Sequence, residues 1–133
     1  MRILIAEDDF ASRKFLSKFL STYGECDITI DGMEAVEAFM IAWDEGKPYD
    51  LICLDIMMPE LDGVKALKTI RDIESQKGIE ETDRAKIIMT TALNDKNSVM
   101  DAFDTGCEAY AAKPIDTKKM VDVMKKLGLI NKD

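Results

Sequence analysis

Histidine is absent from this chain of 133 residues, so the chain offers no imidazole for acid–base catalysis, for metal binding or for a phosphohistidine of its own. Long hydrophobic runs are missing too. The apolar run of residues 3–6 near the N-terminus is too short for a signal-peptide core or a membrane span. We therefore expect a cytoplasmic protein that makes no membrane contact.

Cysteine and basic residues are scarce. Cys26, Cys53 and Cys107 are odd in number, lie far apart and form no CxxC pair, so we expect buried, reduced thiols rather than a redox role. Lysine and arginine number 18 against 26 acidic residues, which gives a net charge of −8. This balance argues against nonspecific nucleic-acid binding, which needs a basic face to displace phosphate counterions.

The composition of the chain is that of an ordinary globular domain. Apolar residues make up 47% and charged residues 33% of the chain, and its length suffices for one domain with its own core. No repeat, low-complexity segment or Pro/Ser-rich linker divides it. We expect a single domain over residues 1–133, with the last helix ending near Gly128 and no output domain after it.

Short apolar runs alternate with longer helical patterns about five times along the chain. The predicted strands are residues 3–6, 26–30, 51–54, 87–89 and 109–112. Five predicted helices carry these apolar stripes: Phe15, Leu16, Phe19 and Leu20; Ala35, Val36, Phe39, Met40 and Trp43, which should point inward; Val64, Leu67, Ile70 and Ile73; Val99, Met100 and Phe103; Met120, Val121, Met124 and Leu127. The residues expected to begin helices are Asp31, Asn94 or Asp95, and Asp116. Those expected to end helices are Gly24, Gly106 and Gly128. The polar stretch Ser75–Arg84 has no assignment.

Strands that alternate with helices across short turns indicate βαβ units and a mainly parallel sheet. Right-handed crossovers place helices on both faces, so the expected fold class is α/β with a doubly wound, five-stranded parallel sheet. In such folds, ligands bind beyond the carboxyl ends of the strands. The residues that follow each apolar run are therefore the candidates for a site.

Charged and hydroxyl side chains occupy those positions. Asp8 and Asp9 follow the first run, Asp55 the third, Thr91 the fourth and Lys113 the fifth. Two bare carboxylates about 4 Å apart repel by roughly 4 kcal/mol at an effective dielectric of about 20, so such a cluster favours a hard cation with oxygen ligands, such as magnesium. A carboxylate nucleophile beside a metal, an ammonium and a hydroxyl predicts phosphoryl transfer through an aspartyl phosphate.

The segment from Asp55 to Val64, with the sequence DIMMPELDGV, closely resembles the phosphoacceptor segment of response-regulator receiver domains. Glu7-Asp8-Asp9, Thr91-Ala92 and Lys113-Pro114 are similar to the short motifs of that family and stand in the family's order. The resemblance spans essentially the whole chain. It implies a flavodoxin-like sheet with the strand order 2-1-3-4-5 and a cis peptide bond before Pro114.

The resemblance implies a role for each matching residue. Asp55 would accept a phosphoryl group from a phosphohistidine on a sensor histidine kinase or a histidine phosphotransfer protein. Asp9 and Asp55 would bind Mg²⁺ or Mn²⁺ together with the backbone carbonyl of Met57, and Asp8 would bind through water.

The resemblance also implies how the signal would leave the site. Lys113 and Thr91 would contact the phosphoryl oxygens, and Thr91 would shift together with Tyr110 to remodel the surface of helix 4, strand 5 and helix 5 for an unknown protein target. Met57 and Leu93 occupy the positions that flank the phosphoryl group and tune its hydrolysis. Two apolar side chains there cannot orient an attacking water, so we expect slow dephosphorylation. The protein would not be a turnover enzyme, and it would be a monomer or a phosphorylation-linked dimer.

Other interpretations stay open at this point. A phosphate-independent interaction module is one; a phosphohydrolase of the haloacid-dehalogenase type would need a second aspartate where Met57 stands. A flavodoxin-like FMN binder would need a Ser/Thr-rich phosphate loop in place of Asp8-Asp9. Thr90 competes with Thr91 for the hydroxyl role, and Ala92 after Thr91 favours Thr91. The sequence does not distinguish an effector from a relay or a phosphate sink.

Overall fold

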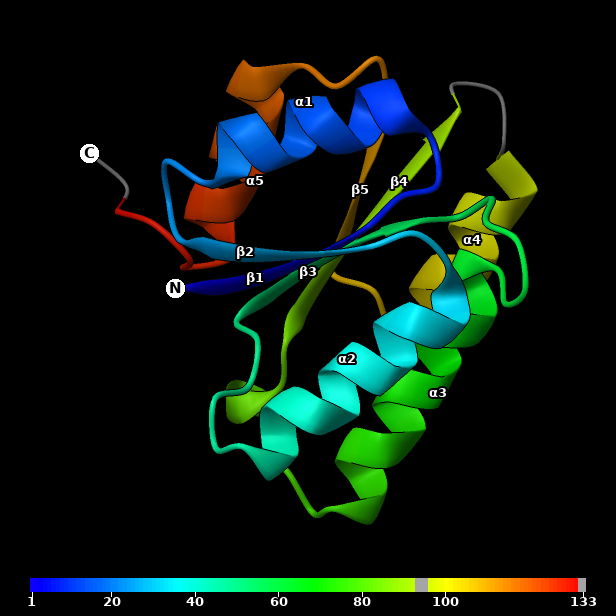
Figure 1. Ribbon diagram of the computed structural model, residues 1–133, viewed down its shortest axis with the longest axis vertical. Helices are drawn as coiled ribbons and strands as arrows, with labels where there is room; N and C mark the ends of the chain where they lie inside the picture. Colours follow the sequence, from blue (N-terminus) through cyan, green and yellow to red (C-terminus); the bar gives the residue numbers. More distant parts are fainter. Residues whose placement is uncertain (93–95, 132–133) are drawn as a thin grey trace.

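The computed structural model describes residues 1–92 and 96–131, over which five strands and five α-helices alternate along the chain (Figure 1). The strands are β1 (Arg2–Ala6), β2 (Glu25–Thr29), β3 (Leu51–Asp55), β4 (Lys86–Ala92) and β5 (Ala109–Lys113). The helices are α1 (Phe10–Leu20), α2 (Gly32–Asp44), α3 (Gly63–Gln76), α4 (Lys96–Thr105) and α5 (Thr117–Lys126), and a short 3₁₀-helix, η1 (Glu81–Asp83), precedes β4.

The strands form one parallel sheet in the order β2-β1-β3-β4-β5. Helices α1 and α5 cover one face of the sheet, and α2, α3 and α4 cover the other (Figure 1). β3 lies at the centre and every one of its residues is buried. The predicted fold class and strand order are confirmed, and the peptide bond before Pro114 is cis as the resemblance implies.

Each face of the sheet has its own apolar core. Along β1, Leu4 and Ala6 pack against the α2–α4 side, whereas Ile3 and Ile5 pack against α1 and α5. This alternation is the two-residue period of a strand. Both faces are covered, so the strands read as continuous apolar runs in the sequence.

The apolar stripe predicted for α2 is partly wrong. The helix buries Ala35, Phe39 and Ala42, and Met40, one residue further round the helix, is 45% exposed. The prediction that Met40 points inward therefore fails. Apolar residues of α1 and α4 that lie off the buried faces are exposed in the same way: Phe15, Met100 and Phe103.

Two predicted helix starts are confirmed by their capping hydrogen bonds. Asp31 Oδ1 accepts the backbone N–H of Glu34 at 2.8 Å, and Asp116 Oδ1 accepts that of Lys118 at 2.9 Å. The carboxylate of Glu34 in turn accepts the N–H of Ile30, which completes a reciprocal pair of caps. The start predicted for α4, at Asn94 or Asp95, lies outside the described residues.

One predicted helix end is wrong. α1 ends at Leu20, well before Gly24. Gly24 instead packs against the backbone of Met1, where a Cβ atom would overlap the carbonyl oxygen. Gly106 and Gly128, with φ of 123° and 77°, follow α4 and α5 in the positive-φ region that favours glycine.

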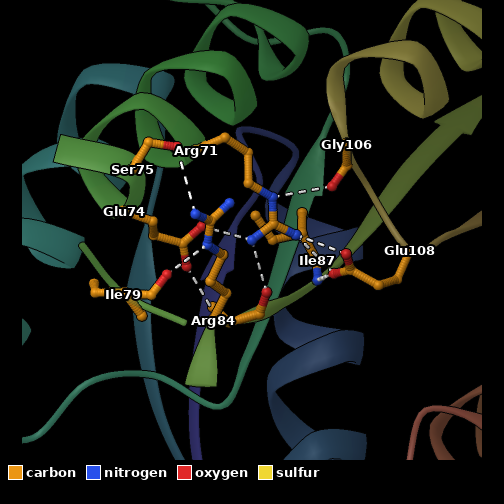
Figure 2. Close-up of polar contacts among 9 residues, drawn as sticks. Arg71, Glu74, Ser75, Ile79, Arg84, Ile87, Gly106 and Glu108 are labelled. Carbon is orange, nitrogen blue, oxygen red and sulfur yellow. Dashed lines mark hydrogen bonds and ion pairs between the residues drawn. The ribbon is translucent and has the colours of Figure 1, made fainter. Parts of the chain in front are cut away.

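The unassigned stretch Ser75–Arg84 is the end of α3, a turn and η1. Just before it, in α3, a buried ion pair places Arg71 Nη1 2.7 Å from Glu74 Oε1 (Figure 2). The other carboxylate oxygen of Glu74 accepts the N–H of Ala85 at 3.0 Å, and Arg84 Nε donates to the carbonyl oxygen of Ile79. These bonds hold the start of β4 against α3.

Candidate functional site

The carboxyl ends of β1, β3 and β5 meet at one edge of the sheet and bring three charged side chains together. Glu7 follows β1, Asp55 ends β3 and Lys113 ends β5. Nζ of Lys113 lies 2.6 Å from Oε1 of Glu7 and 3.1 Å from Oδ2 of Asp55. Glu7 is 0% and Asp55 4% exposed, so two buried carboxylates share one ammonium group.

The segment around Asp55 explains why this side chain is held firmly at the edge. Asp55 continues the alternation of Leu51 and Cys53, which pack on the α1 and α5 side. Gly63 packs against the backbone carbonyl of Asp55, where a Cβ atom would overlap the oxygen, and its N–H donates to the carbonyl oxygen of Ile56 at 2.9 Å. A glycine is therefore required at this place in the DIMMPELDGV segment.

The acidic group at this edge consists of Glu7, Asp8 and Asp55. One carboxylate oxygen of each lies within 4.8 Å of the other two, an arrangement that could hold a metal ion. Asp9, which the sequence predicted as a metal ligand, is not a member of this group. Its Oδ2 accepts the backbone N–H of Ser12 at 2.9 Å and caps α1, and this hydrogen bond lowers the pKa of Asp9.

Glu7 was missing from the predicted site, although two sequence signals point to it. The alternation of Ile3 and Ile5 along β1 places Glu7 on the α1 and α5 side, where Lys113 and Asp55 also lie. The spacing of Asp9 to the first turn of the next helix is that of an N-cap. Counting by twos along β1 would have placed Glu7 on the same side of the sheet as Lys113 and Asp55.

The two buried carboxylates differ in how readily they take a proton. Burial, together with the hydrogen bond and charge of Glu7, raises the pKa of Asp55 to about 7, although Lys113 opposes the shift. Burial also raises the pKa of Glu7, but hydrogen bonds with Asp55, Lys113 and the Asp9 N–H outweigh it and lower the pKa overall. Of the two, Asp55 is therefore the carboxyl that is protonated more readily. A divalent cation would oppose that protonation, and the all-oxygen donor set fits magnesium.

The other predicted site residues lie around this group. Met57 is 68% exposed, and its backbone N–H donates to Asp55 Oδ1 at 3.3 Å. Thr91 is 2% exposed at the end of β4, and its hydroxyl lies 3.4 Å from the carbonyl oxygen of Ala92. Tyr110 points outward from β5, 48% exposed, with its ring edge-to-face against Phe103. Leu93 lies outside the described residues.

The chain is a doubly wound α/β domain with a lysine and an acidic group at the carboxyl edge of its parallel sheet, the edge at which domains of this class bind ligands. Residues 3–125 match the family model of the response regulator receiver domain, and the chain belongs to that family. None of the helices in the described part of the chain is long and apolar enough to cross a membrane.

Relatives of known sequence differ greatly in length. The chemotaxis protein CheY of Bacillus subtilis is 32% identical over 128 residues, which cover 94% of this chain and 95% of CheY. The hybrid signal transduction histidine kinase L of Dictyostelium discoideum is 34% identical over 96% of this chain, but the match covers only 7% of the kinase. The chain likewise spans 52% of the transcriptional regulatory protein YhcZ of B. subtilis.

Solved structures agree with the fold. A chain in the co-crystal structure of the histidine phosphotransfer signaling protein Ypd1 and the receiver domain of Ssk1, from Saccharomyces cerevisiae, matches with a TM-score of 0.81 and 29% identity, covering 96% of this chain and 88% of that one. A chain in the CheX–CheY–BeF3–Mg²⁺ complex of Borrelia burgdorferi matches with a TM-score of 0.79 and 26% identity, covering 96% and 89%.

Proposed function

We propose that this receiver domain is phosphorylated on Asp55 by a phosphohistidine of a sensor histidine kinase or a histidine phosphotransfer protein. The observation that carries the proposal is the placement of Asp55, 4% exposed at the end of β3, with Lys113 at 3.1 Å and the carboxylates of Glu7 and Asp8 beside it. The Ypd1 and Ssk1 pair among the similar structures supports this type of donor.

Asp8, Asp55 and the backbone carbonyl of Met57 are the proposed metal ligands, for Mg²⁺ or Mn²⁺. A divalent cation there supplies charge stabilisation for the oxygens of the transferring phosphoryl group. This proposal leaves Asp9 out of the set, because one oxygen of its carboxylate caps α1. Glu7 is the buried anion that holds the ammonium group of Lys113 at the edge of the site.

The proposed step needs an ionised Asp55. Its carboxylate oxygen forms a bond to phosphorus while the bond between phosphorus and the donor's imidazole nitrogen breaks, and that nitrogen keeps the electron pair. Lys113 would offset the negative charge of the phosphoryl oxygens, and the hydroxyl of Thr91 would donate a hydrogen bond to one of them. The domain assists its own modification and is not a turnover enzyme.

Phosphorylation would change the surface formed by α4, β5 and α5. The new group adds roughly −1.5 to −2 charges at the end of β3, and it acts by biasing two states that already exist. Thr91 and Tyr110 are the proposed switch residues. Met100, Phe103 and Tyr110 are exposed on this surface, and they are candidates for contact with a downstream protein.

The phosphoryl group should be long-lived. Met57 is 68% exposed beside Asp55 and offers no strong hydrogen-bonding group to an attacking water. We expect the modified protein to survive for minutes or longer after the phosphodonor is removed, as followed by intact-mass spectrometry. A lifetime of seconds would contradict this part of the proposal.

The decisive experiment is intact-mass spectrometry after incubation with acetyl phosphate and magnesium. Wild-type protein should gain one phosphate only when magnesium is present, and Asp55→Asn should gain none. Folded wild-type protein that gains no phosphate would instead favour an interaction module that works without phosphate. A phosphate that persists in Asp55→Asn would place the acceptor elsewhere.

A further inference from the structure

Thr90 carries a buried hydroxyl for which the described residues provide no hydrogen-bond partner. The residue is 1% exposed, and its Oγ1 is unpaired within residues 1–92 and 96–131. Thr29, a comparable threonine at the end of β2, donates instead to the carbonyl oxygen of Ile5 at 3.1 Å. A buried hydroxyl without a partner lowers stability and calls for an explanation, such as a role in another state of the protein.

The sheet places this hydroxyl beside the phosphoacceptor. Thr90 pairs with Asp55 of β3 on one side and with Ala111 of β5 on the other. Ile88 and Cys53, each two residues earlier on its strand, both pack on the α1 and α5 side of the sheet. Alternation therefore points Thr90 and Asp55 to that same side, as directly paired neighbours.

The side chain of Lys113 crosses over β4, the strand that carries Thr90. Lys113 starts from β5, yet its ammonium group contacts Asp55 on β3 and Glu7 beyond β1, so it must pass over β4. Thr90 belongs to β4 and points to the side on which this crossing takes place. An ammonium group has three N–H donors, and Lys113 contacts two carboxylates as ion pairs, so at least one donor is left for a third acceptor.

We propose that Thr90 is a positioning residue of the phosphoacceptor site, whose hydroxyl accepts a hydrogen bond from Lys113 when the ammonium group moves from Asp55 to the incoming phosphoryl group. The inference rests on the proposed function. Formation of the acyl phosphate removes the negative charge of the ionised Asp55 carboxylate, so Lys113 loses an anionic partner there as it gains a phosphoryl oxygen. A hydroxyl can accept and donate at once, and Thr90 can donate its own proton to the Asp55 carbonyl oxygen.

The test compares Thr90→Val, which keeps the shape and removes the hydroxyl, with Thr90→Ser, which keeps the hydroxyl. The rate of phosphorylation by acetyl phosphate with magnesium, followed by intact mass, should fall about fivefold in Thr90→Val, the size of one ordinary hydrogen bond. Thr90→Ser should recover most of the wild-type rate. In a Lys113→Met background, Thr90→Val should have no further effect, because the hydroxyl acts through Lys113.

Thr29→Val is the matched control, because it removes a buried strand-end hydroxyl that already has a partner. It should lower stability to urea and leave the phosphorylation rate unchanged, whereas Thr90→Val should leave stability equal or higher. Equal rates for wild type and Thr90→Val would overturn the inference while the proposed function stands. Folded wild-type protein that takes no phosphate would overturn both.

Discussion

The two ends of the parallel sheet each hold a glutamate that is 0% exposed, and they neutralise it differently. At the amino end of β4, Glu74 accepts from Arg71 and from the N–H of Ala85 (Figure 2). At the carboxyl end of β1, Glu7 shares the ammonium group of Lys113 with a second buried carboxylate, that of Asp55. Arg71 faces one fully buried carboxylate, Glu74, and one that water reaches, Glu108, whereas Lys113 faces two buried carboxylates.

The Arg71 network is complete in its hydrogen bonds. Nε donates to the carbonyl oxygen of Gly106 at 3.0 Å, Nη1 to Glu74 and to the carbonyl oxygen of Ala85, and Nη2 to both carboxylate oxygens of Glu108 at 2.8 and 2.7 Å. The planar guanidinium suits such a fixed, multiple arrangement. This network joins α3 to the starts of β4 and β5, and it leaves nothing for a ligand to complete.

The edge that carries Asp55 lacks such a complete set of partners. Its buried acids outnumber its ammonium groups, and the pKa of Asp55 is raised to about 7. A bound cation or a positively charged phosphodonor would lower the free energy of this end, whereas the hydrogen bonds of the Arg71 end are complete without a ligand. The contrast separates a part of the molecule that maintains the fold from a part that is arranged to react.

The largest expected effect on stability comes from the network around Arg71. Arg71→Met should lower the free energy of unfolding by about 3–5 kcal/mol, because it leaves the charge of Glu74 buried with only the Ala85 N–H as a partner. Urea unfolding monitored by the fluorescence of Trp43 measures this. A loss below about 1 kcal/mol would mean that Glu74 takes a proton and that the network contributes little.

Two further variants check the same network. Glu108→Gln should cost less than Arg71→Met, because the side chain of Glu108 is 26% exposed and water can replace part of the interaction. The double replacement of Arg71 and Glu74 by methionine should recover much of the loss, since the one carboxylate that then lacks Arg71, Glu108, is 26% exposed and can be hydrated. Failure of the double variant to recover would assign the loss to packing.

The second prediction concerns the edge with excess acid. The pKa of Asp55 is higher in the folded state, at about 7, than its ordinary value of 3.8, so its stabilising contribution is full below about pH 4 and is lost as the pH rises towards 7. Glu7 is shifted downward from 4.5, so its contribution changes only below that pH. In EDTA, Asp55→Asn should therefore remove the decline between pH 4 and 7 and gain about 2 kcal/mol at pH 8. An unchanged pH profile in this variant would contradict the assigned pKa.

The smallest predicted effect distinguishes the roles of two adjacent acidic residues, Asp8 and Asp9. Asp9→Ala should lower the free energy of unfolding by about 1 kcal/mol through loss of the α1 cap, and it should keep the increase in melting temperature that magnesium produces. Asp8→Asn should abolish the magnesium effect with little change in metal-free stability. Thermal unfolding with and without magnesium measures both, and the reverse result would restore Asp9 as the metal ligand.

Much of the fold could be predicted because its signals are local. The apolar runs of the strands and the capping spacing of Asp31 with Glu34 depend on neighbouring residues alone. The predictions for Met40 and Gly24 failed because burial depends on which face of a helix meets the sheet. Asp55 and Lys113 were identified because both stand at strand ends, where a parallel fold collects them at one edge.

The sequence by itself determined the α/β class, the strand order through its resemblance to receiver domains, and the edge of the sheet at which chemistry can occur. Only the tertiary structure showed that Glu7 lies with Asp8 and Asp55, that Lys113 reaches across β4, and that the hydroxyl of Thr90 on β4 is buried. The reason is physical: a residue's type and spacing set its local conformation, whereas its electrostatic partners come from strands that are far apart in the chain.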